Sequence, residues 1–413
     1  MATGISLCLK GYTVSFYDSD KKKIKSFKRG KVPFVEEDIE ETIKECLSNK
    51  NAIFADNLKE ALENSNIIFL CIGTPILPEG ESDLINIKNV CAELRKLVRH
   101  EVVVVIKSTV NPGDYLETKN LLSSKNFSIA VNPEFLREGS ALQNALHPNR
   151  IIIGTDDEYS KKILKELYSK FESPKIFTDP MSAILIKYAS NSFLAVKISF
   201  INEIANICDI VGASIDDVAL GIGLDPRIGR DFLKAGIGFG GSCLPKDTKN
   251  LIRFAEKNSL STNIVKAADI VNENQYKVVI KKLTKNLGTL ENKVISVLGL
   301  SFKGETDDLR GSVSLKLIEE LKKSGVVVKA HDYLSYEKAK KIIKDIFISK
   351  DVYAVVKDAD AVVIATDWKE YTKLDWEKIK ELMKGNLIVD GRNLLDPKLF
   401  KKLGFVYEGI GRK

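Results

Sequence analysis

The strongest constraint on the fold is a set of short, nearly continuous apolar runs that occur on both sides of a long helical stretch. Residues 101–109 (EVVVVIKST) are typical, because branched apolar side chains fill the run and polar residues end it. Strands without polar alternation are buried on both faces, as in parallel sheets covered by helices. The other runs occupy residues 12–18, 65–75, 127–133, 292–304, 326–333, 359–368 and 386–393.

Residues 180–212 lie between the two groups of runs and carry apolar residues at helical spacing throughout. Pro180 begins this stretch and Gly212 ends it, as expected for helix termini. The length favours a connector or the spine of an oligomer. A second helical stretch covers residues 247–286 and is interrupted near NSLST.

These patterns predict an α/β protein with two doubly wound, Rossmann-like domains, joined by a long central helix and a helical middle domain. We expect the first α/β domain at residues 1–179, the middle domain at 180–285 and the second α/β domain at 286–413. The middle domain is the expected site of homodimer or higher homo-oligomer formation.

Composition excludes several functions for the 413-residue chain. The net charge of +7 comes from lysines that alternate with apolar residues, as in residues 20–31, so solvated helix faces are favoured over a nucleic-acid site. No apolar stretch approaches a membrane span, and no secretory signal follows Met1, which predicts a cytoplasmic protein with no membrane partner. The six cysteines are scattered, which argues against a disulfide framework and a zinc site.

Gly236, Gly238 and Gly241 spell the G-x-G-x-x-G pattern of dinucleotide loops. That loop needs a strand before it and a helix opening on its last glycine, whereas a polar helical stretch precedes these residues and Pro245 follows. We interpret the run as backbone that a ligand approaches closely.

The expected position of a cofactor loop is ahead of residues 12–18, because Asp18 ends that strand where an acid binds the adenosine ribose. Residues 2–10 form the predicted helix after the loop. We therefore expect the chain to begin one element late, through a truncated sequence or a mis-assigned start, without its first strand and glycine turn. In the second half, Ser301 replaces a needed glycine after Gly299, so that turn is not predicted to hold a dinucleotide.

Cys243 lies two residues after the last glycine of the run and has four candidate roles. No histidine is spaced for a shared metal site, and no second cysteine forms a redox motif with it. A buried structural cysteine stays open. A nucleophile is the fourth role, because Lys246 and the glycine amides favour a thiolate and Asp247 is placed to pair with a base or a water.

A thiol beside a nicotinamide cofactor captures an aldehyde as a thiohemiacetal, which a second oxidation turns into a thioester. This chemistry needs an oxyanion donor and a carboxylate to orient water. Lys197 and Asn202, five residues apart and expected roughly on one face of the long helix, are one candidate pair, with a solvated helix edge as the alternative. Glu134 and Glu138 are the other pair, with capping of a helix N-terminus as the alternative.

Several motifs then resemble the UDP-glucose/GDP-mannose dehydrogenase family, and the resemblance covers the chain from Ala2 onward. The motifs are KSTVNPGD (107–114), NPEFLREGSA (132–141), IKYASNSFLAVKISFINEIA (186–205), GIGLDPRIG (221–229), GFGGSCLPKD (238–247), GLSFKGETDDLR (299–310) and DGRN (390–393).

The resemblance implies an NAD-dependent oxidation of UDP-glucose to UDP-glucuronate in two steps, consuming two NAD and one water. It implies that Cys243 is the nucleophile, that Lys197 and Asn202 stabilise the oxyanion, and that Asp247 supports base chemistry. It assigns the water to Glu138 with Thr109 and adds Glu134 to the catalytic cluster.

The resemblance also implies two sets of binding residues and no metal site. The NAD contacts are Asp18, Lys23, Thr74, Thr109, Glu138, Lys246 and Arg310. The UDP-sugar contacts are Glu134, Phe135, Leu136, Arg137, Lys187, Asn191, Lys197, Arg227, Phe239, Gly240, Gly241, Lys303 and Arg392, with Arg227 reaching a neighbouring subunit.

Two sequence features, Ser242 and residues 221–229, indicate which sugar nucleotide is the substrate. Relatives that act on N-acetylated UDP-sugars carry a histidine before the cysteine, where this chain has Ser242. GDP-mannose dehydrogenases share GGSCLPKD, while residues 221–229 favour UDP-glucose. Oxidation of another nucleotide sugar, and nucleotide-sugar binding without catalysis, remain the alternatives.

Overall fold

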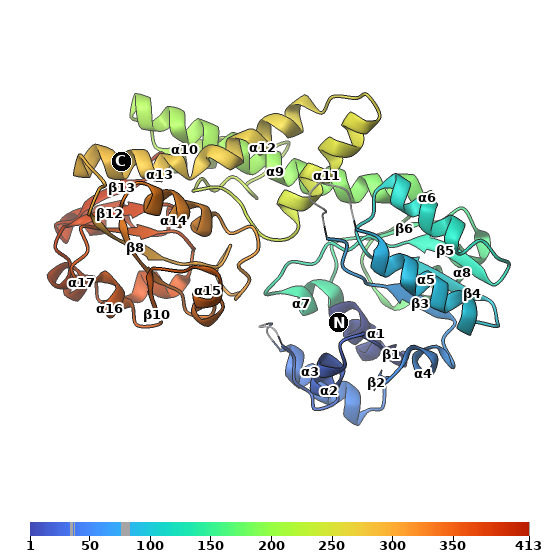
Figure 1. Cartoon of the computed structure of the whole chain (residues 1–413). Helices are drawn as coiled ribbons and strands as arrows, with labels where there is room; N and C mark the ends of the chain where they lie inside the picture. The colour runs from blue at the N-terminus through green and yellow to red at the C-terminus, as the bar shows by residue number, and fades with distance from the viewer. Residues whose placement is uncertain (34–35, 37, 76–82, 413) are drawn as a thin grey trace. The chain divides into compact units, whose positions relative to one another are not determined.

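The computed structural model describes residues 1–33, 36, 38–75 and 83–412. The chain divides into two compact units, Met1–Ser190 and Asn191–Lys413. Each unit contains a largely parallel sheet with helices packed against it, so the predicted pair of Rossmann-like domains is confirmed (Figure 1).

The second unit contains a complete doubly wound sheet of six parallel strands in the order β10-β9-β8-β11-β12-β13. The first strand of the unit is central and the strand order reverses beside it, which is the Rossmann arrangement. All four strands predicted in this half are present. The strands are β8 (Val294–Leu298), β9 (Val327–His331), β10 (Phe347–Ser349), β11 (Ala361–Ile364), β12 (Leu387–Asp390) and β13 (Val406–Gly409).

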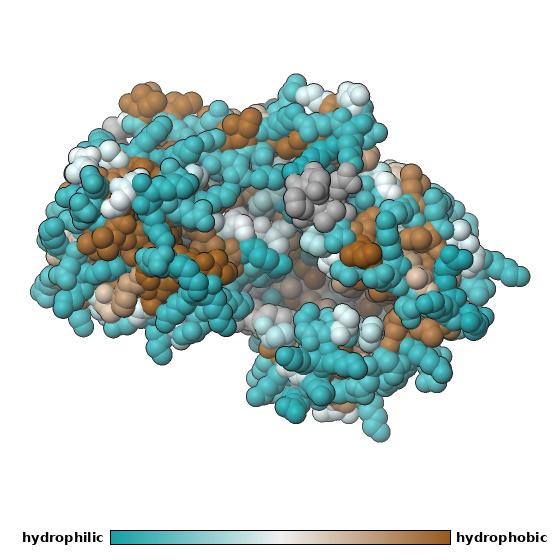
Figure 2. Space-filling view, viewed as in Figure 1, coloured by the Kyte–Doolittle hydropathy of each residue, from teal (hydrophilic) through white to brown (hydrophobic). Residues whose placement is uncertain are grey.

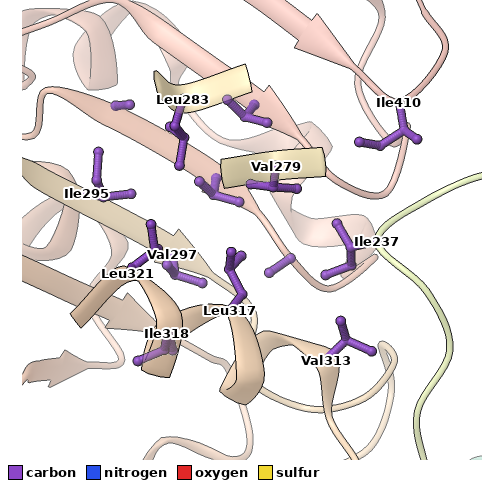
Figure 3. Packing of buried hydrophobic residues seen from close by; sticks show 14 of the residues in the cluster. Ile237, Val279, Leu283, Ile295, Val297, Val313, Leu317, Ile318, Leu321 and Ile410 are labelled. Carbon is purple, nitrogen blue, oxygen red and sulfur yellow. The ribbon is translucent and has the colours of Figure 1, made fainter. Parts of the chain in front are cut away.

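Alternate residues of these strands pack on helices at opposite faces of the sheet, because successive strand side chains point to opposite sides. Ala361 and Val363 of β11 join the cluster formed with α13 and α14, which Figure 3 shows around Val279 and Leu317. Val362 and Ile364 belong to the cluster on the other face, with α16, α17 and α18. The helices are α13 (Lys277–Leu287), α14 (Val313–Lys323), α15 (Tyr336–Ile342), α16 (Val352–Val356), α17 (Trp376–Leu382) and α18 (Pro397–Lys402).

The first unit contains a five-stranded sheet in the order β3-β4-β5-β6-β7 and a separate pair, β1-β2. The predicted strands of this half pair in parallel with their neighbours, and β5 also pairs antiparallel, at Val131 and Gly154, with β6, a strand that the sequence patterns did not predict. The expectation about a strand ahead of Ala2 concerns no described residue and is untested. The strands are β1 (Val14–Phe16), β2 (Ala52–Phe54), β3 (Ile67–Leu70), β4 (Val102–Ile106), β5 (Phe127–Val131), β6 (Ile151–Gly154) and β7 (Lys175–Thr178).

The helices of the first unit connect these strands and cover their apolar side chains. The predicted helix at residues 2–10 is α1, Ala2–Leu9, and its Ile5 packs with Ile43 of α3. The helices are α1, α2 (Lys21–Phe27), α3 (Ile39–Ser48), α4 (Leu58–Leu62), α5 (Ile85–Leu97), α6 (Pro112–Leu121), α7 (Ala141–Leu146) and α8 (Glu158–Leu167).

The predicted long helix is α9, Pro180–Val211, which contributes residues to both units. The Asp179 carboxylate accepts the Ser182 N–H at 2.9 Å, which caps the first turn, and proline is tolerated there because its position needs no N–H. Gly212 ends the helix with a φ of 78°, a left-handed conformation that favours glycine.

The helical middle of the chain continues with α10 (Ile215–Gly223), α11 (Leu244–Lys257) and α12 (Asn263–Gln275). The predicted interruption of the second helical stretch lies between α11 and α12. A further break at Tyr276 separates α12 from α13, and the sequence pattern did not predict it.

Protonation of His331 is expected to destabilise the second unit. The ring is fully buried, with Nδ1 2.9 Å from the Tyr371 hydroxyl and Nε2 3.1 Å from the Lys350 carbonyl oxygen. Burial lowers the pKa of His331 below its ordinary value of 6.5. His331 therefore binds a proton more readily in the unfolded chain than in the folded chain. The free energy of unfolding falls as pH drops below about 6.5.

Both tryptophans, Trp368 and Trp376, lie in the second unit, so their fluorescence in urea reports its unfolding. We expect wild type to lose more stability than H331Q between neutral pH and pH of about 5.5. Equal losses in the two proteins would contradict this role for His331.

Candidate active site

Cys243 is an exposed thiol at the N-cap position of α11, two residues after the last glycine of the run. The positive end of a helix dipole favours an anionic group at this position. The alternative of a buried structural cysteine is therefore wrong for Cys243, whereas Cys8, Cys46, Cys91 and Cys208 are buried. Among the residues that the structure describes, no group of histidine, cysteine and acidic side chains is arranged to hold a metal ion.

Asp247 lies one helical turn beyond Cys243 and is almost completely buried. Its N–H donates to the Cys243 carbonyl at 2.8 Å, and its Oδ2 accepts the Asn191 Nδ2–H of α9 at 2.6 Å. The Lys246 ammonium lies 3.8 Å from Oδ1. A carboxylate one turn from a thiol, held by an amide and beside a cation, is suited to proton transfer.

The glycine run crosses other backbone with no room for a side chain. A Cβ atom at Gly240 would lie 2.2 Å from the Gly311 carbonyl oxygen, and one at Gly241 would lie 2.8 Å from the Phe302 ring. These contacts explain the glycines without a dinucleotide. Asn272 and Gln275 of α12, which sequence reasoning missed, also bind the run: Gln275 Nε2 donates to the Gly236 carbonyl at 3.1 Å.

Lys197 and Asn202 contact different segments, so the expectation that they share one helix face is wrong. The Lys197 ammonium donates to the carbonyls of Ile228 and Gly229, at 3.0 and 3.3 Å. Asn202 Oδ1 accepts the Gly236 N–H at 2.8 Å. Five residues turn an α-helix by about 500°, which separates the side chains by about 140°.

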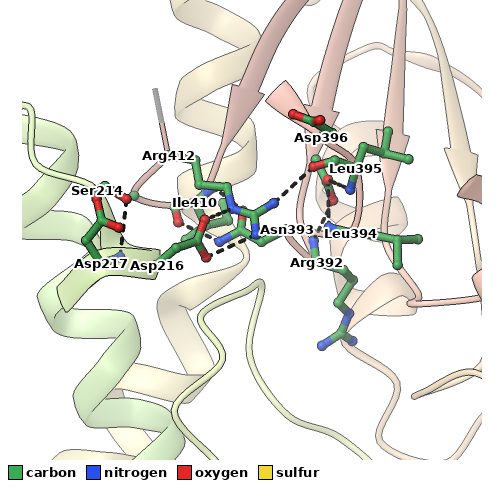
Figure 4. A network of polar contacts seen from close by, with 12 residues as sticks. Ser214, Asp216, Asp217, Arg392, Asn393, Leu394, Leu395, Asp396, Ile410 and Arg412 are labelled. Carbon is green, nitrogen blue, oxygen red and sulfur yellow. Dashed lines mark hydrogen bonds and ion pairs between the residues drawn. The ribbon is translucent and has the colours of Figure 1, made fainter. Parts of the chain in front are cut away.

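Arg392 binds three backbone segments of the second unit. Its guanidinium donates to the carbonyls of Ala365, Gly238 and Phe302, at 2.8, 2.9 and 3.3 Å. Figure 4 shows Arg392 in the same loop as Asn393 and Leu394. The Asn393 side-chain amide donates to the Ile410 carbonyl at 2.8 Å, and the Leu394 N–H donates to Asp390 Oδ2 at 2.7 Å. Burial lowers the pKa of Arg392. Because its guanidinium binds three backbone segments, Arg392, a predicted UDP-sugar contact, also organises the loops around the glycine run.

Two predicted ligand-binding arginines are held by aspartates two residues earlier. Arg227 Nη2 lies 2.6 Å from Asp225 Oδ2, and Arg310 Nη2 lies 2.7 Å from Asp308 Oδ2. Both arginines are exposed, and the planar guanidinium is thereby oriented before any ligand binds. The predicted contact Lys303 lies over the Phe302 ring at 5.9 Å.

Asp332 fills the turn after β8 in the second unit. Its Oδ2 accepts the N–H groups of Leu300 and Ser301 at 2.7 and 3.0 Å, and its Oδ1 accepts those of Leu334 and Ser335. Burial raises the pKa of Asp332, but these hydrogen bonds outweigh burial and hold it below its usual range. The carboxylate occupies the amides that would bind a phosphate, which agrees with the prediction that this turn holds no dinucleotide.

In the first unit, Glu134 lies between β5 and α7 and is held by α9. The buried Lys187 ammonium donates to the Glu134 carbonyl and lies 3.7 Å from its carboxylate. The neighbouring Phe135 ring lies between two cations, with Arg150 at 4.0 Å and Lys187 at 5.2 Å from its centroid. At the start of α7, Glu36 accepts the N–H groups of Gly139 and Ala141. The Glu134 carboxylate accepts the Leu136 N–H ahead of this helix, so the alternative of satisfying backbone donors stays open beside the catalytic one.

Lys107, Asn132 and Tyr168 form a buried network beside this segment that the sequence reasoning missed. The Lys107 ammonium donates to Asn132 Oδ1 at 3.1 Å, and the Tyr168 hydroxyl donates to the same oxygen at 2.6 Å. Burial lowers the pKa of Lys107, although Cys71 and Glu134 oppose the shift. The signal was available in the sequence, because Lys107 and Asn132 directly follow two neighbouring strands.

The residues at the strand ends of the first unit fit the adenosine side of NAD. Asp18 follows β1, is partly exposed, and lies 3.3 Å from the Lys23 ammonium. A carboxylate at that position accepts ribose hydroxyls in Rossmann folds. Thr74 Oγ donates to the Thr109 carbonyl at 2.9 Å, which fixes the segments after β3 and β4 together.

Three family models match successive parts of the chain. All belong to the UDP-glucose/GDP-mannose dehydrogenase family: the NAD binding domain at residues 1–172, the central domain at 181–274 and the UDP binding domain at 296–397. The chain belongs to this family of NAD-dependent nucleotide-sugar dehydrogenases.

Individual relatives narrow the comparison. The UDP-glucose 6-dehydrogenase of Rickettsia conorii is 38% identical, with 100% of this chain and 97% of the relative covered. UDP-glucose 6-dehydrogenase YwqF of Bacillus subtilis is 40% identical, with 100% of this chain and 95% of the relative covered. The solved structure of a UDP-glucose dehydrogenase from Pyrobaculum islandicum superposes with a TM-score of 0.92 at 35% identity. The match covers 100% of this chain and 95% of that one.

No helix among the described residues is long and apolar enough to cross a membrane.

The thiols of the native protein are expected to react unequally. Only Cys71 and Cys243 are exposed among the six cysteines, and burial raises the pKa of Cys8 to about 12 and of Cys91 to about 11. Iodoacetamide should therefore modify two thiols rapidly in wild type and one in C243S, as measured by intact mass. Rapid modification of a third thiol in the folded protein would contradict this exposure.

Proposed function

We propose that the chain oxidises the C6 alcohol of UDP-glucose to the carboxylate of UDP-glucuronate. The relatives named UDP-glucose 6-dehydrogenase and the family models support this reaction. The observation that carries it is the exposed Cys243 thiol one helical turn from the buried Asp247 carboxylate. NAD, when bound, accepts one hydride in each of the two oxidations.

The first oxidation removes the hydroxyl proton and a hydride from C6 and leaves an aldehyde. We assign the base chemistry to Asp247, acting directly or through water. The Cys243 thiolate then adds to the aldehyde carbon, and the carbonyl oxygen becomes the oxyanion of a thiohemiacetal. Loss of a second hydride leaves a thioester, and one water hydrolyses it to the acid and regenerates the thiol.

The oxyanion donors are drawn from α9. Asn202 remains a candidate because Gly236 fixes its Oδ1, while its buried Nδ2 has no hydrogen-bond partner in the described part of the chain. Lys197 donates to two carbonyls and keeps one N–H for an oxyanion. Asn191 donates one N–H to Asp247 and also keeps one, so we add it as a further candidate.

The remaining roles follow the family resemblance. Glu138 with Thr109 orients the hydrolytic water, and Glu134 supports them. Asp18, Lys23, Thr74, Lys246 and Arg310 bind NAD. The UDP-sugar is bound by the residues around the glycine run, with Lys303 and Arg392, and by Phe135, Lys187 and their neighbours. We place the reaction in the cytoplasm, where NAD and nucleotide sugars are available.

The thiol's role is tested by the products of C243S. A serine hydroxyl is a much poorer nucleophile at neutral pH, so acid formation should fall on the order of a thousandfold or more while UDP-glucose still binds. UDP-glucuronate is measured by chromatography and binding by calorimetry, with S242A as the neighbouring control. Wild-type rates of acid formation by C243S would refute the thioester route.

The sugar specificity is tested by comparing kcat/KM for UDP-glucose and GDP-mannose at saturating NAD. A higher value for GDP-mannose would support the alternative substrate.

We further propose that the chain forms a homodimer through α9 and α10. Phe193, Phe200 and Ile207 are exposed and recur every seven residues, which places them on one stripe of the helix. Leu220 and Leu224 add exposed apolar surface at α10, where Figure 2 also shows hydrophobic residues at the surface. A self-complementary apolar stripe fits a second copy related by a twofold axis.

Wild type is expected to have the mass of a dimer in sedimentation equilibrium, whereas F200E/I207E should be monomeric because two carboxylates cannot be buried unpaired. L399E, which alters an exposed apolar residue on α18, is the matched control and should remain dimeric. A monomeric wild type, or a dimeric double variant, would argue against this interface.

A further inference from the structure

Asn272 of α12 binds both polar groups of one residue in the glycine run. Its Oδ1 accepts the Phe239 N–H at 2.7 Å, and its Nδ2 donates to the Phe239 carbonyl at 3.0 Å. The side chain is buried, with 6% of its surface exposed. One side-chain amide thus replaces the two hydrogen bonds that a neighbouring strand would make, and the rotation of the Phe239 peptide groups is fixed.

Gly238, the residue before Phe239, leaves the space that the Asn272 amide occupies. Gly238 has a φ of 106°, and a Cβ atom there would lie 2.7 Å from Asn272 Oδ1. A side chain at residue 238 would therefore displace the amide or the backbone. The close approach of Asn272 depends on a position that only glycine occupies without strain.

The hydrogen bonds of the run divide its N–H groups into two sets. Asn202 binds the N–H of Gly236, and the carbonyls of Gly391 and Arg310 bind those of Ile237 and Gly241. The N–H groups of Gly238 and Gly240, on either side of Phe239, have no hydrogen-bond partner in the described part of the chain. Both glycines are buried, and a buried N–H without an acceptor is costly.

We propose that Asn272 is a positioning residue that fixes the Phe239 peptide groups so that the N–H groups of Gly238 and Gly240 bind the nucleotide sugar. This assignment rests on the proposed function. Asn272 binds Phe239 through both its amide oxygen and its amide nitrogen, so its proposed role is to hold the backbone and not to contact the ligand. Its effect on substrate is transmitted through the orientation of the two flanking amides, which precede the nucleophile Cys243.

The experiment compares wild type with N272D, which keeps the side-chain shape but replaces the donor to the Phe239 carbonyl by a carboxylate oxygen. We expect the Kd for UDP-glucose, measured by calorimetry, to rise about tenfold or more, because a buried hydrogen bond is replaced by repulsion. The KM for NAD should stay within about twofold of wild type, because the amide of Asn272 binds Phe239 and not a residue assigned to NAD. N274D is the matched control, because Asn274 is on the same helix and donates to its own helix carbonyl at Ile270.

A second measurement uses wild type alone and does not depend on whether the variant folds. Hydrogen exchange of a peptide covering residues 236–243 is followed by mass spectrometry with and without UDP-glucose. The ligand should slow the exchange of two further amides, those of Gly238 and Gly240.

The outcomes separate the two claims. Wild-type affinity in folded N272D, or no added protection in the peptide, would overturn the role of Asn272. Failure of wild type to bind UDP-glucose at all would instead overturn the proposed function.

Discussion

The geometry of the thiol depends on backbone packing that leaves no space for a single methyl group. The loop carrying Gly240 and Gly241 lies against Gly311 and Phe302, so either glycine would collide with its neighbour if it carried a side chain. Packed protein interiors transmit such displacements rather than absorb them. A shift of this contact would therefore move Cys243, the N-terminus of α11 and the buried Asp247 together.

The two α/β units put an acid at the same place for different purposes. Asp18 follows β1, the strand after α1, and Asp332 follows β9, the strand after α14, but Asp18 is partly exposed while Asp332 is fully buried. In the second unit the acid satisfies the turn's own amides and stabilises the loop that carries Lys303. In the first unit the acid remains accessible to a ribose. One fold thus supplies a cofactor site in one copy and a rigid support in the other, which shows why function must be argued from the site.

Sequence reasoning predicted the long helix and eight of the described strands, because burial on both faces and helical spacing are local signals, and it did not predict β2, β6, β7, β10 and β13. It identified Cys243 because the neighbouring glycines and charges are also local. It missed Asn272 and Gln275, because each acts on backbone that is distant in sequence and a side-chain amide has no local pattern that reveals this. It also missed Lys107, although Lys107 and its partner Asn132 directly follow two neighbouring strands. It paired Lys197 with Asn202 by proximity along α9, whereas helix geometry directs them to different loops.

The central claim is that one thiol carries the sugar through two successive oxidations. The most direct measurement is the ratio of NADH formed to UDP-glucose consumed, with the product identified by mass. The account predicts two NADH for each UDP-glucose and UDP-glucuronate as the product. One NADH per sugar with an aldehyde product, or no NADH, would contradict it.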